Sequence, residues 1–158
     1  MICHPFPPLY NQESTILILG SFPSVKSREQ LFFYGHPQNR FWKVLSAVFR
    51  QETPSSIEDK KVFLLKNRVA LWDVIASCEI EGSADSTVKN AIANDILPIL
   101  RESKINRIFV NGALAKKLYD RHLLPKTKME AFALPSTSPA NAAWNLDRLI
   151  DACKIIRD

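Results

Sequence analysis

Residues 14–21 read STILILGS, a continuous apolar run that ends in a glycine and a serine. A strand without a polar side is typical of a parallel sheet that is covered on both faces, and this feature constrains the fold most strongly. Residues 68–76, 105–112 and 128–136 have the same character. We therefore expect four buried strands, of which residues 14–21 form the first.

Segments in which apolar residues recur at helical spacing separate these strands. They lie at residues 40–49, 55–68, 94–103 and 113–122, an amphipathic segment closes the chain at 141–158, and residues 79–87 read as a polar loop. Ser55 precedes Glu58 by three residues, which predicts a capping box. Parallel neighbours need crossover connections, so we predict one domain over residues 1–158. Its fold is a three-layer α/β/α sandwich with a central, mainly parallel four-stranded sheet.

Composition and charge exclude several classes of protein. No segment approaches the ~18 uninterrupted apolar residues of a membrane span, and no basic leader precedes an apolar stretch, so we expect a soluble cytoplasmic protein. Cys3, Cys78 and Cys153 form no CxxC pair, and the three histidines lack metal-ligand spacing, so we expect no metal and no cofactor. The formal net charge of +5 favours a polyanionic partner without identifying one.

Polar or turn-forming residues end each predicted strand. In open α/β sheets, ligands bind beyond the carboxyl ends of the strands, where this chain has Gly20, Asp73, Asn111 and Ser136. Gly20 allows a tight turn that exposes backbone N–H groups to a negatively charged oxygen. A plain turn is the alternative there, and Asp73 can equally cap or turn the chain.

Residues 33–42 read FYGHPQNRFW, an unusual polar insertion between aromatic pairs. The carbonyl oxygen of Asn39 can accept a hydrogen bond from a water molecule and aim it, although Asn39 also precedes a helix and is a good N-cap. His36 is either a loop residue or a neighbour of a phosphate. Tyr34 and Phe22 can stack on a flat ring or belong to the core.

Residues 134–141 read LPSTSPAN. Ser138 followed by Pro139 predicts an N-cap and a first helical position, and a helix N-terminus is also a ready site for a backbone phosphate. Basic residues near the strand ends, including Lys26 and Arg40, can meet phosphates or simply be solvated.

These segments, in this order, resemble the uracil-DNA glycosylase superfamily, and specifically its hypoxanthine-DNA (deoxyinosine) glycosylase branch. The resemblance implies a base-flipping enzyme that excises deaminated bases from DNA, without a cofactor and, we expect, as a monomer. Phe22 stands where many members have Asp or Asn, and Leu134 where many have His. In this branch the asparagine of HPQNRFW positions the water, which assigns that role to Asn39. We further predict that Asp73 accepts N1–H of hypoxanthine, a donor that adenine lacks.

The predicted site therefore has three groups of residues. Asn39 is the catalytic residue. The base-binding residues are Gly20, Ser21, Phe22, Tyr34, Asp73 and Asn111, and the DNA-binding residues are Ser24, Lys26, His36, Arg40, Ser136, Thr137, Ser138 and Asn141. Two alternatives remain open: a glycosylase directed at uracil or at G:U and G:T mismatches, and a nonenzymatic α/β module that binds nucleic acids or nucleotides.

Overall fold

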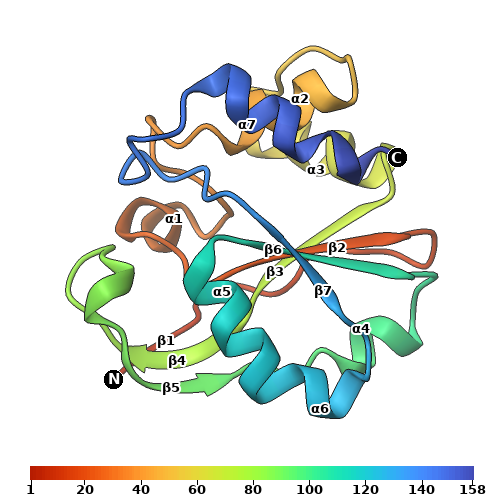
Figure 1. Cartoon of the computed structure of the whole chain (residues 1–158). Coiled ribbons are helices and arrows are strands. Elements are labelled where there is room, and N and C mark those ends of the chain that lie inside the picture. The colour runs from red at the N-terminus through yellow and green to blue at the C-terminus, as the bar shows by residue number, and fades with distance from the viewer.

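The computed structural model describes all residues, 1–158, and contains the predicted four-stranded sheet (Figure 1). Every strand in it is parallel, in the order β3-β2-β6-β7. The strands are β2 (Ile16–Gly20), β3 (Val69–Asp73), β6 (Arg107–Asn111) and β7 (Ala131–Leu134). All five residues of β2 are buried, which agrees with the apolar run that predicts this strand.

The register of the sheet brings the polar strand ends to one edge. Gly20 of β2 lies opposite Asp73 of β3, and Asn111 of β6 lies opposite Leu134 of β7. The carboxyl ends of parallel strands share an edge, so the loops that follow them are held close together. The predicted location of the site follows from this register.

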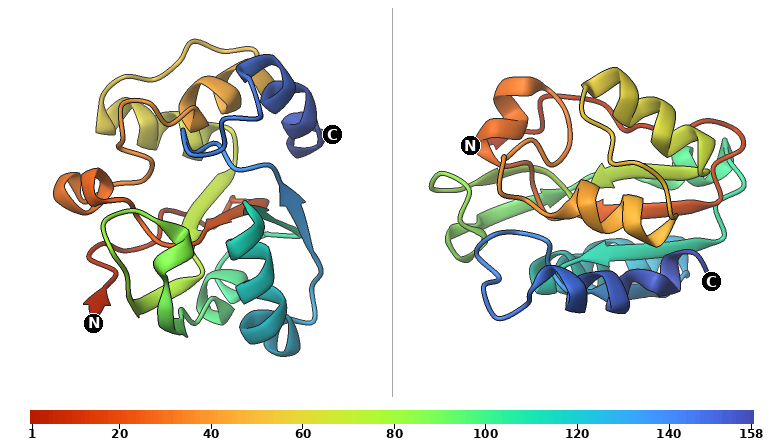
Figure 2. Two further views of the ribbon diagram at one scale, coloured as in Figure 1. Left: turned by 60° about the vertical axis from the view of Figure 1, so that its left-hand side comes forward. Right: turned by 90° about the horizontal axis from the view of Figure 1, so that it is seen from above.

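Helices cover both faces of the parallel sheet, which confirms the three layers (Figure 2). One face carries α2 (Phe41–Val48), α3 (Ile57–Lys66) and α7 (Leu146–Cys153), which ends in a 3-10 turn, η3 (Lys154–Ile156). The other carries α4 (Leu97–Arg101), α5 (Ala113–Leu118), a π turn η2 (Tyr119–Leu123) and α6 (Leu124–Thr127). Along β2, Ile16 and Ile18 join the first core while Leu17 and Leu19 join the second. None of these helices has the length and apolarity to cross a membrane.

A second, antiparallel sheet is absent from the sequence prediction. It consists of β1 (Ile2–Cys3), β4 (Ile75–Glu79) and β5 (Lys89–Ala93), in the order β1-β4-β5. The prediction of one strand over residues 68–76 was wrong, because the chain leaves the parallel sheet at Val74, whose N–H donates to the Gly20 carbonyl. The apolar run continues through this bend, so its pattern does not reveal it.

Two short helices and two caps also differ from the prediction. The helix α1 (Val25–Gln30) and the 3-10 turn η1 (Asp85–Thr87) were not predicted. Ser56, rather than Ser55, caps α3 by accepting the Asp59 N–H. The predicted helix start at Ser138 was wrong, because α7 begins at Leu146 with Asn145 as its N-cap, and the preceding residues form an irregular loop.

Candidate active site

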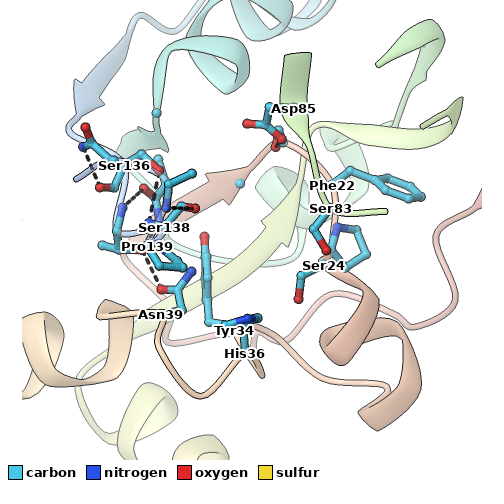
Figure 3. Close-up of a pocket in the computed structure, with 18 of the residues that line it drawn as sticks. Phe22, Ser24, Tyr34, His36, Asn39, Ser83, Asp85, Ser136, Ser138 and Pro139 are labelled. Carbon is cyan, nitrogen blue, oxygen red and sulfur yellow. Dashed lines mark hydrogen bonds between the residues drawn. The ribbon is translucent and has the colours of Figure 1, made fainter. Parts of the chain in front are cut away.

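A cavity of about 1010 Å³ opens at the carboxyl edge of the parallel sheet (Figure 3). The segments after β2 and β7, the segment that leads into α2, and the loop between β4 and β5 line it. Every site residue predicted from the sequence lines this cavity except Lys26 and Arg40. The fold thus gathers residues from widely separated segments into one pocket.

Asn39, Thr137 and Asn111 form a chain of hydrogen bonds that we call the polar wall. Asn111 Nδ2 donates to Thr137 Oγ1 over 3.1 Å, and the Thr137 hydroxyl donates to Asn39 Oδ1 over 2.8 Å. The Thr137 backbone N–H also donates to Asn111 Oδ1 at 3.2 Å. Because Thr137 is buried, water does not compete freely for these bonds, and the wall links β6, the loop after β7 and the segment before α2.

The polar wall determines which way the Asn39 amide faces. Its Oδ1 accepts the backbone N–H of Phe41 at 3.0 Å in addition to the Thr137 hydroxyl, so both lone pairs of this oxygen are used. The Asn39 nitrogen lies on the Tyr34 side of the amide (Figure 3). The carbonyl oxygen that was expected to aim a water is thus engaged within the protein in this structure, and the catalytic role of Asn39 stays a prediction. The oxygen stabilises the start of α2, and the side chain offers its N–H donors to the pocket.

The first predicted segment supplies backbone donors. The N–H groups of Ser21 and Phe22 donate no hydrogen bond within the protein, so they are free to bind an oxygen. The Phe22 ring is buried in the second core, lies 5.6 Å from the Arg28 guanidinium carbon, and points away from Asn39 and Tyr34 (Figure 3). This ring does not present the free face that the predicted stacking on a base requires.

Tyr34 and Asp73 lie beside Gly20 and form what we call the pocket floor. The Tyr34 ring stacks on Phe41 at 3.9 Å between centroids, so one of its faces is already covered. Burial raises the pKa of the Tyr34 phenol and the Asp73 charge adds to the rise, while the nearby Asn111 amide offsets part of it. The hydroxyl therefore keeps its proton at physiological pH.

The loop after β7 approaches the sheet closely at Gly112. A Cβ atom at this position would lie 3.3 Å from Ser136 Cβ, and Gly112 also has a positive φ of 101°, so glycine is required here. Ser136 Oγ accepts the Ser138 N–H, and Ser138 Oγ accepts the Ala140 N–H. Each hydroxyl still has its own proton to donate. Asn141 Nδ2 is used to hold the Ser136 carbonyl.

Arg40 holds this loop in place from the other side. Its guanidinium donates to the backbone carbonyls of Thr137 at 3.4 Å, Ser138 at 2.8 Å and Asn141 at 3.2 Å, and also to that of Trp144. The loop thus takes up four of the five guanidinium N–H donors, and the predicted contact of Arg40 with DNA stays a prediction.

The other residues predicted to contact DNA differ in how much of their hydrogen-bonding capacity is already used within the protein. Lys26 lies on the exposed surface of α1 and pairs loosely with Glu29, with 3.6 Å between Nζ and Oε2. Ser24 is the N-cap of α1, and its hydroxyl bonds to Ser27. His36 Nδ1 accepts the Gln38 N–H, which leaves Nε2 as the donor of a neutral ring at the rim.

Two functional candidates were missed by the sequence reasoning. Asp85, in the polar loop between β4 and β5, lines the pocket and accepts the Ser21 hydroxyl at 2.9 Å. Burial raises the pKa of Asp85, the Ser21 hydrogen bond offsets part of the rise, and the Asp73 charge adds to it. His4, from the N-terminal segment, reaches Asp73. The only local sequence feature that could have indicated Asp85 is the Gly-Ser stretch beside it, and no local feature indicates His4.

Comparison with known proteins places this pocket in a family. Residues 7–157 match the family described as the uracil DNA glycosylase superfamily. A protein of Methanosarcina acetivorans named hypoxanthine DNA glycosylase is 35% identical over 151 residues, which cover 94% of each chain. A protein of the same name from Methanosarcina barkeri is 33% identical over 103 residues, covering 61% of this chain and 65% of that protein.

A solved structure agrees with these sequence relatives. It is a solution NMR structure from Methanosarcina acetivorans, provisionally described as a uracil DNA glycosylase, and it superposes with a TM-score of 0.82 at 31% identity over the full length of both chains. The likeness therefore includes the whole arrangement of strands and helices that forms the pocket. The chain belongs to the uracil DNA glycosylase superfamily.

Proposed function

We propose that this protein hydrolyses the N-glycosidic bond of hypoxanthine in DNA and leaves an abasic site. The observation that carries the proposal is the Asn39 amide, which the polar wall fixes in the same pocket as the free backbone donors of Ser21 and Phe22. The relatives named hypoxanthine DNA glycosylase support the choice of base.

The chemistry needs stabilisation of charge more than a strong base. As the bond between C1′ and the base nitrogen breaks, its electrons leave with the base, and the sugar acquires oxocarbenium character. The N–H groups of Ser21 and Phe22 stabilise the negative charge that develops on the base oxygen. An N–H of the Asn39 side chain donates a hydrogen bond to the oxygen of a water molecule. That oxygen keeps a lone pair, with which it attacks C1′. The water then loses its proton to solvent.

Recognition of the base is assigned to Asp73. Its Oδ1 accepts the N1–H of hypoxanthine, and adenine has an acceptor rather than a donor at that position. Asn111 was predicted to contact the base as well. Its amide is bonded to Thr137 on both sides, so we propose that it acts by holding the polar wall.

The DNA backbone is proposed to lie along the pocket rim. The Ser136 and Ser138 hydroxyls keep free protons for phosphate oxygens, and Lys26 and His36 add donors beside them. The target nucleotide must leave the helical stack to enter the pocket, which costs least for a mispaired base. One chain supplies the complete pocket, which supports a monomer, and three unpaired cysteines fit the reducing cytoplasm.

Two other functions are compatible with parts of the site. Uracil also has an N–H beside a carbonyl, so a uracil or mismatch-directed glycosylase would use the same Asp73 acceptor. A nonenzymatic nucleic-acid or nucleotide-binding module would use the rim alone, with Asn39 serving only as a helix cap.

Base release from a panel of duplexes separates these functions. Each duplex carries hypoxanthine, uracil, xanthine or a G:T mismatch at one position, with unmodified adenine as the matched control. We expect hypoxanthine to be released fastest. Faster release of uracil would favour the first alternative, and DNA binding without release of any base would favour the second.

A further inference from the structure

Two oxygens of the pocket floor have no hydrogen-bond partner. The Tyr34 hydroxyl is fully buried and has no partner at hydrogen-bonding geometry, although the Asn111 amide lies close enough to offset part of the rise in its pKa; among the buried side-chain polar atoms only Trp72 Nε1 is also unpartnered. Asp73 Oδ1 likewise accepts no hydrogen bond from the protein, but unlike the Tyr34 hydroxyl it keeps some accessible surface in the pocket. Leaving such groups unpaired costs free energy, so these atoms indicate a partner that arrives with the ligand.

Gly20 lets both oxygens reach the same place. A Cβ atom on Gly20 would clash with Asp73 Oδ1 and lie 3.0 Å from Tyr34 Oη. Both oxygens therefore converge on one point above the carboxyl end of β2, in the pocket where the base is proposed to sit. Tyr34 itself has a positive φ of 50°, an uncommon conformation for a bulky residue, which the fold imposes to bring its ring there.

The two oxygens have opposite hydrogen-bonding character. The Tyr34 phenol keeps its proton and has no acceptor, so it is a donor. Asp73 Oδ1 is an acceptor. A ligand that satisfies both must carry an acceptor and a donor on neighbouring atoms.

His4 fixes which Asp73 oxygen faces the pocket. Its Nε2 lies 2.7 Å from Asp73 Oδ2, and the two side chains are 4% and 5% exposed. The Phe6 backbone N–H donates to His4 Nδ1 at 3.5 Å, so Nε2 carries the proton that is donated to Asp73. Edge contacts with Phe6 and Trp72 hold the imidazole ring. The N-terminal segment therefore determines the orientation of the Asp73 carboxylate.

We propose that Tyr34 Oη and Asp73 Oδ1 together read the lactam edge of the base, with Tyr34 donating to the carbonyl oxygen and Asp73 accepting the adjacent N–H, and that His4 is the positioning residue for Asp73. This inference rests on the proposed function and extends it, because it assigns Tyr34 a hydrogen-bonding role in place of stacking and gives His4 a role in specificity.

The pair matches the chemical change that deamination makes. Adenine and cytosine present an amino group beside a ring nitrogen acceptor, and deamination converts these into a carbonyl beside an N–H. Tyr34 and Asp73 can then bond to the carbonyl and the N–H of hypoxanthine or uracil. In adenine or cytosine, by contrast, the Tyr34 donor faces an amino donor and the Asp73 acceptor faces a ring nitrogen acceptor. Guanine carries the same edge and an additional amino group, so the floor separates deaminated bases from adenine and cytosine but does not by itself reject guanine.

Two variants test the pair. Tyr34→Phe removes only the hydroxyl and keeps the ring on Phe41, and His4→Phe removes the donor to Asp73. Tyr10→Phe and His122→Gln are the matched controls, because both lie outside the pocket. Single-turnover excision of hypoxanthine should fall about 10-fold for Tyr34→Phe and for His4→Phe, which is the loss expected for one buried hydrogen bond. The controls should match the wild type.

A binding measurement separates recognition from general damage. Duplexes carry a 2′-fluoroarabino nucleotide, which resists hydrolysis, with either hypoxanthine or unsubstituted purine as its base. The wild type should bind the hypoxanthine duplex more tightly, and each variant should reduce this preference by about 10-fold while its affinity for the purine duplex stays the same. Purine has neither the carbonyl nor the N–H of the lactam edge, so neither hydrogen bond forms with it and the variants have none to lose.

Stability provides a further distinction for Tyr34. Removal of an unpaired buried hydroxyl should leave the thermal midpoint unchanged or raise it, whereas a hydroxyl that holds the fold together would lower it on removal. An unchanged preference for hypoxanthine in either variant would overturn the inference, and so would an equal loss of affinity for both duplexes. If the wild type releases no base and shows no preference, the proposed function fails together with the inference.

Discussion

The polar wall and the pocket floor belong to one cavity but are built in opposite ways. In the wall, Asn39 Oδ1 and both ends of the Asn111 amide are bonded within the protein, through Thr137 and the Phe41 N–H. In the floor, the Tyr34 hydroxyl and one Asp73 oxygen are unpaired. The wall is fixed before DNA arrives, whereas the floor is completed only by a ligand.

This difference matches the two tasks that the pocket is proposed to perform. Placement of a water molecule requires a donor that is already in position, because a displacement of about 1 Å can cost about 100-fold in rate. Discrimination between bases requires groups that are left unpaired with the wrong base, because that penalty supplies the selectivity. Variants of the wall should therefore act mainly on rate, and variants of the floor mainly on base preference.

Asn39→Ala is the sharpest test of the wall and has the largest expected effect. The change removes the N–H donors in the pocket and the acceptor for the Phe41 N–H. We expect single-turnover excision to fall about 100-fold and the free energy of unfolding in urea to fall by about 1 kcal/mol. Affinity for DNA, measured by fluorescence anisotropy, should persist.

Gln38→Ala is the matched control, since its exposed side chain precedes the wall and makes no hydrogen bond. If Asn39→Ala loses stability and still excises hypoxanthine at the wild-type rate, helix capping is the whole role of this residue, and the contrast between wall and floor disappears.

Thr137→Val breaks the middle of the wall with little change of shape. Asn39 Oδ1 then loses one of its two donors, and Asn111 Nδ2 loses its acceptor. Because Asn39 remains but is less firmly held, we expect excision to fall about 10-fold and stability to fall by about 1–2 kcal/mol. Thr137→Ser keeps the hydroxyl and should retain a rate near that of the wild type. Equal loss in both variants would assign the effect to packing of the methyl group.

The sequence predicts the wall and the floor to different extents. Four parallel strands follow from apolar runs, and their shared edge brings Asn111, Asp73 and Gly20 together, so the location of the site was predictable. Asn39 also stood out, but its orientation did not. A single residue that caps a helix and lines a pocket has the same sequence signal for either role, and only the bond from Thr137 shows that its oxygen is already used.

The rest depends on contacts between segments that share no local pattern. His4 reaches Asp73 across 69 positions, and Asp85 reaches Ser21 across 64. Arg40 has the sequence context of a phosphate ligand, and its carbonyl partners 97 to 104 positions away appear only in the folded chain. Single-sequence reasoning detects periodicity and local caps, so contacts of this kind lie outside its reach.

Salt dependence of DNA binding separates the two cations that were predicted together. Lys26→Gln should weaken binding to all sequences alike and reduce the slope of log K against log salt by about 1, because one phosphate contact is lost. Arg40→Met should leave this slope unchanged and lower stability by about 1 kcal/mol, since water replaces part of its hydrogen bonds to the loop. An equal decrease of the slope in both variants would show that Arg40 contacts a phosphate in addition to holding the loop.

Asp85→Asn tests whether the charge of Asp85, in the loop between β4 and β5, reduces the stability of the folded chain. Burial raises the pKa of Asp85, so its ionised form is less stable in the folded chain than in the unfolded chain. Ionised Asp85 therefore reduces stability at pH 7, and this cost is lost as the pH falls through the raised pKa towards the unfolded value of about 3.9. Asparagine keeps an oxygen for the Ser21 hydroxyl and carries no charge.

The expected gain in stability at pH 7 is small, about a few tenths of a kcal/mol, because Asp85 as a whole is exposed and solvent screens its partly desolvated carboxylate. Urea unfolding at pH 7 and pH 4.5 should show a gain that shrinks at the lower pH, with the exposed Glu52→Gln as the control for loss of a carboxylate. A loss of stability at pH 7 would show that the Asp85 carboxylate is better satisfied than its surroundings suggest. The Asp85 carboxylate would then differ from the Tyr34 hydroxyl and Asp73 Oδ1 of the pocket floor, which have no hydrogen-bond partner within the protein.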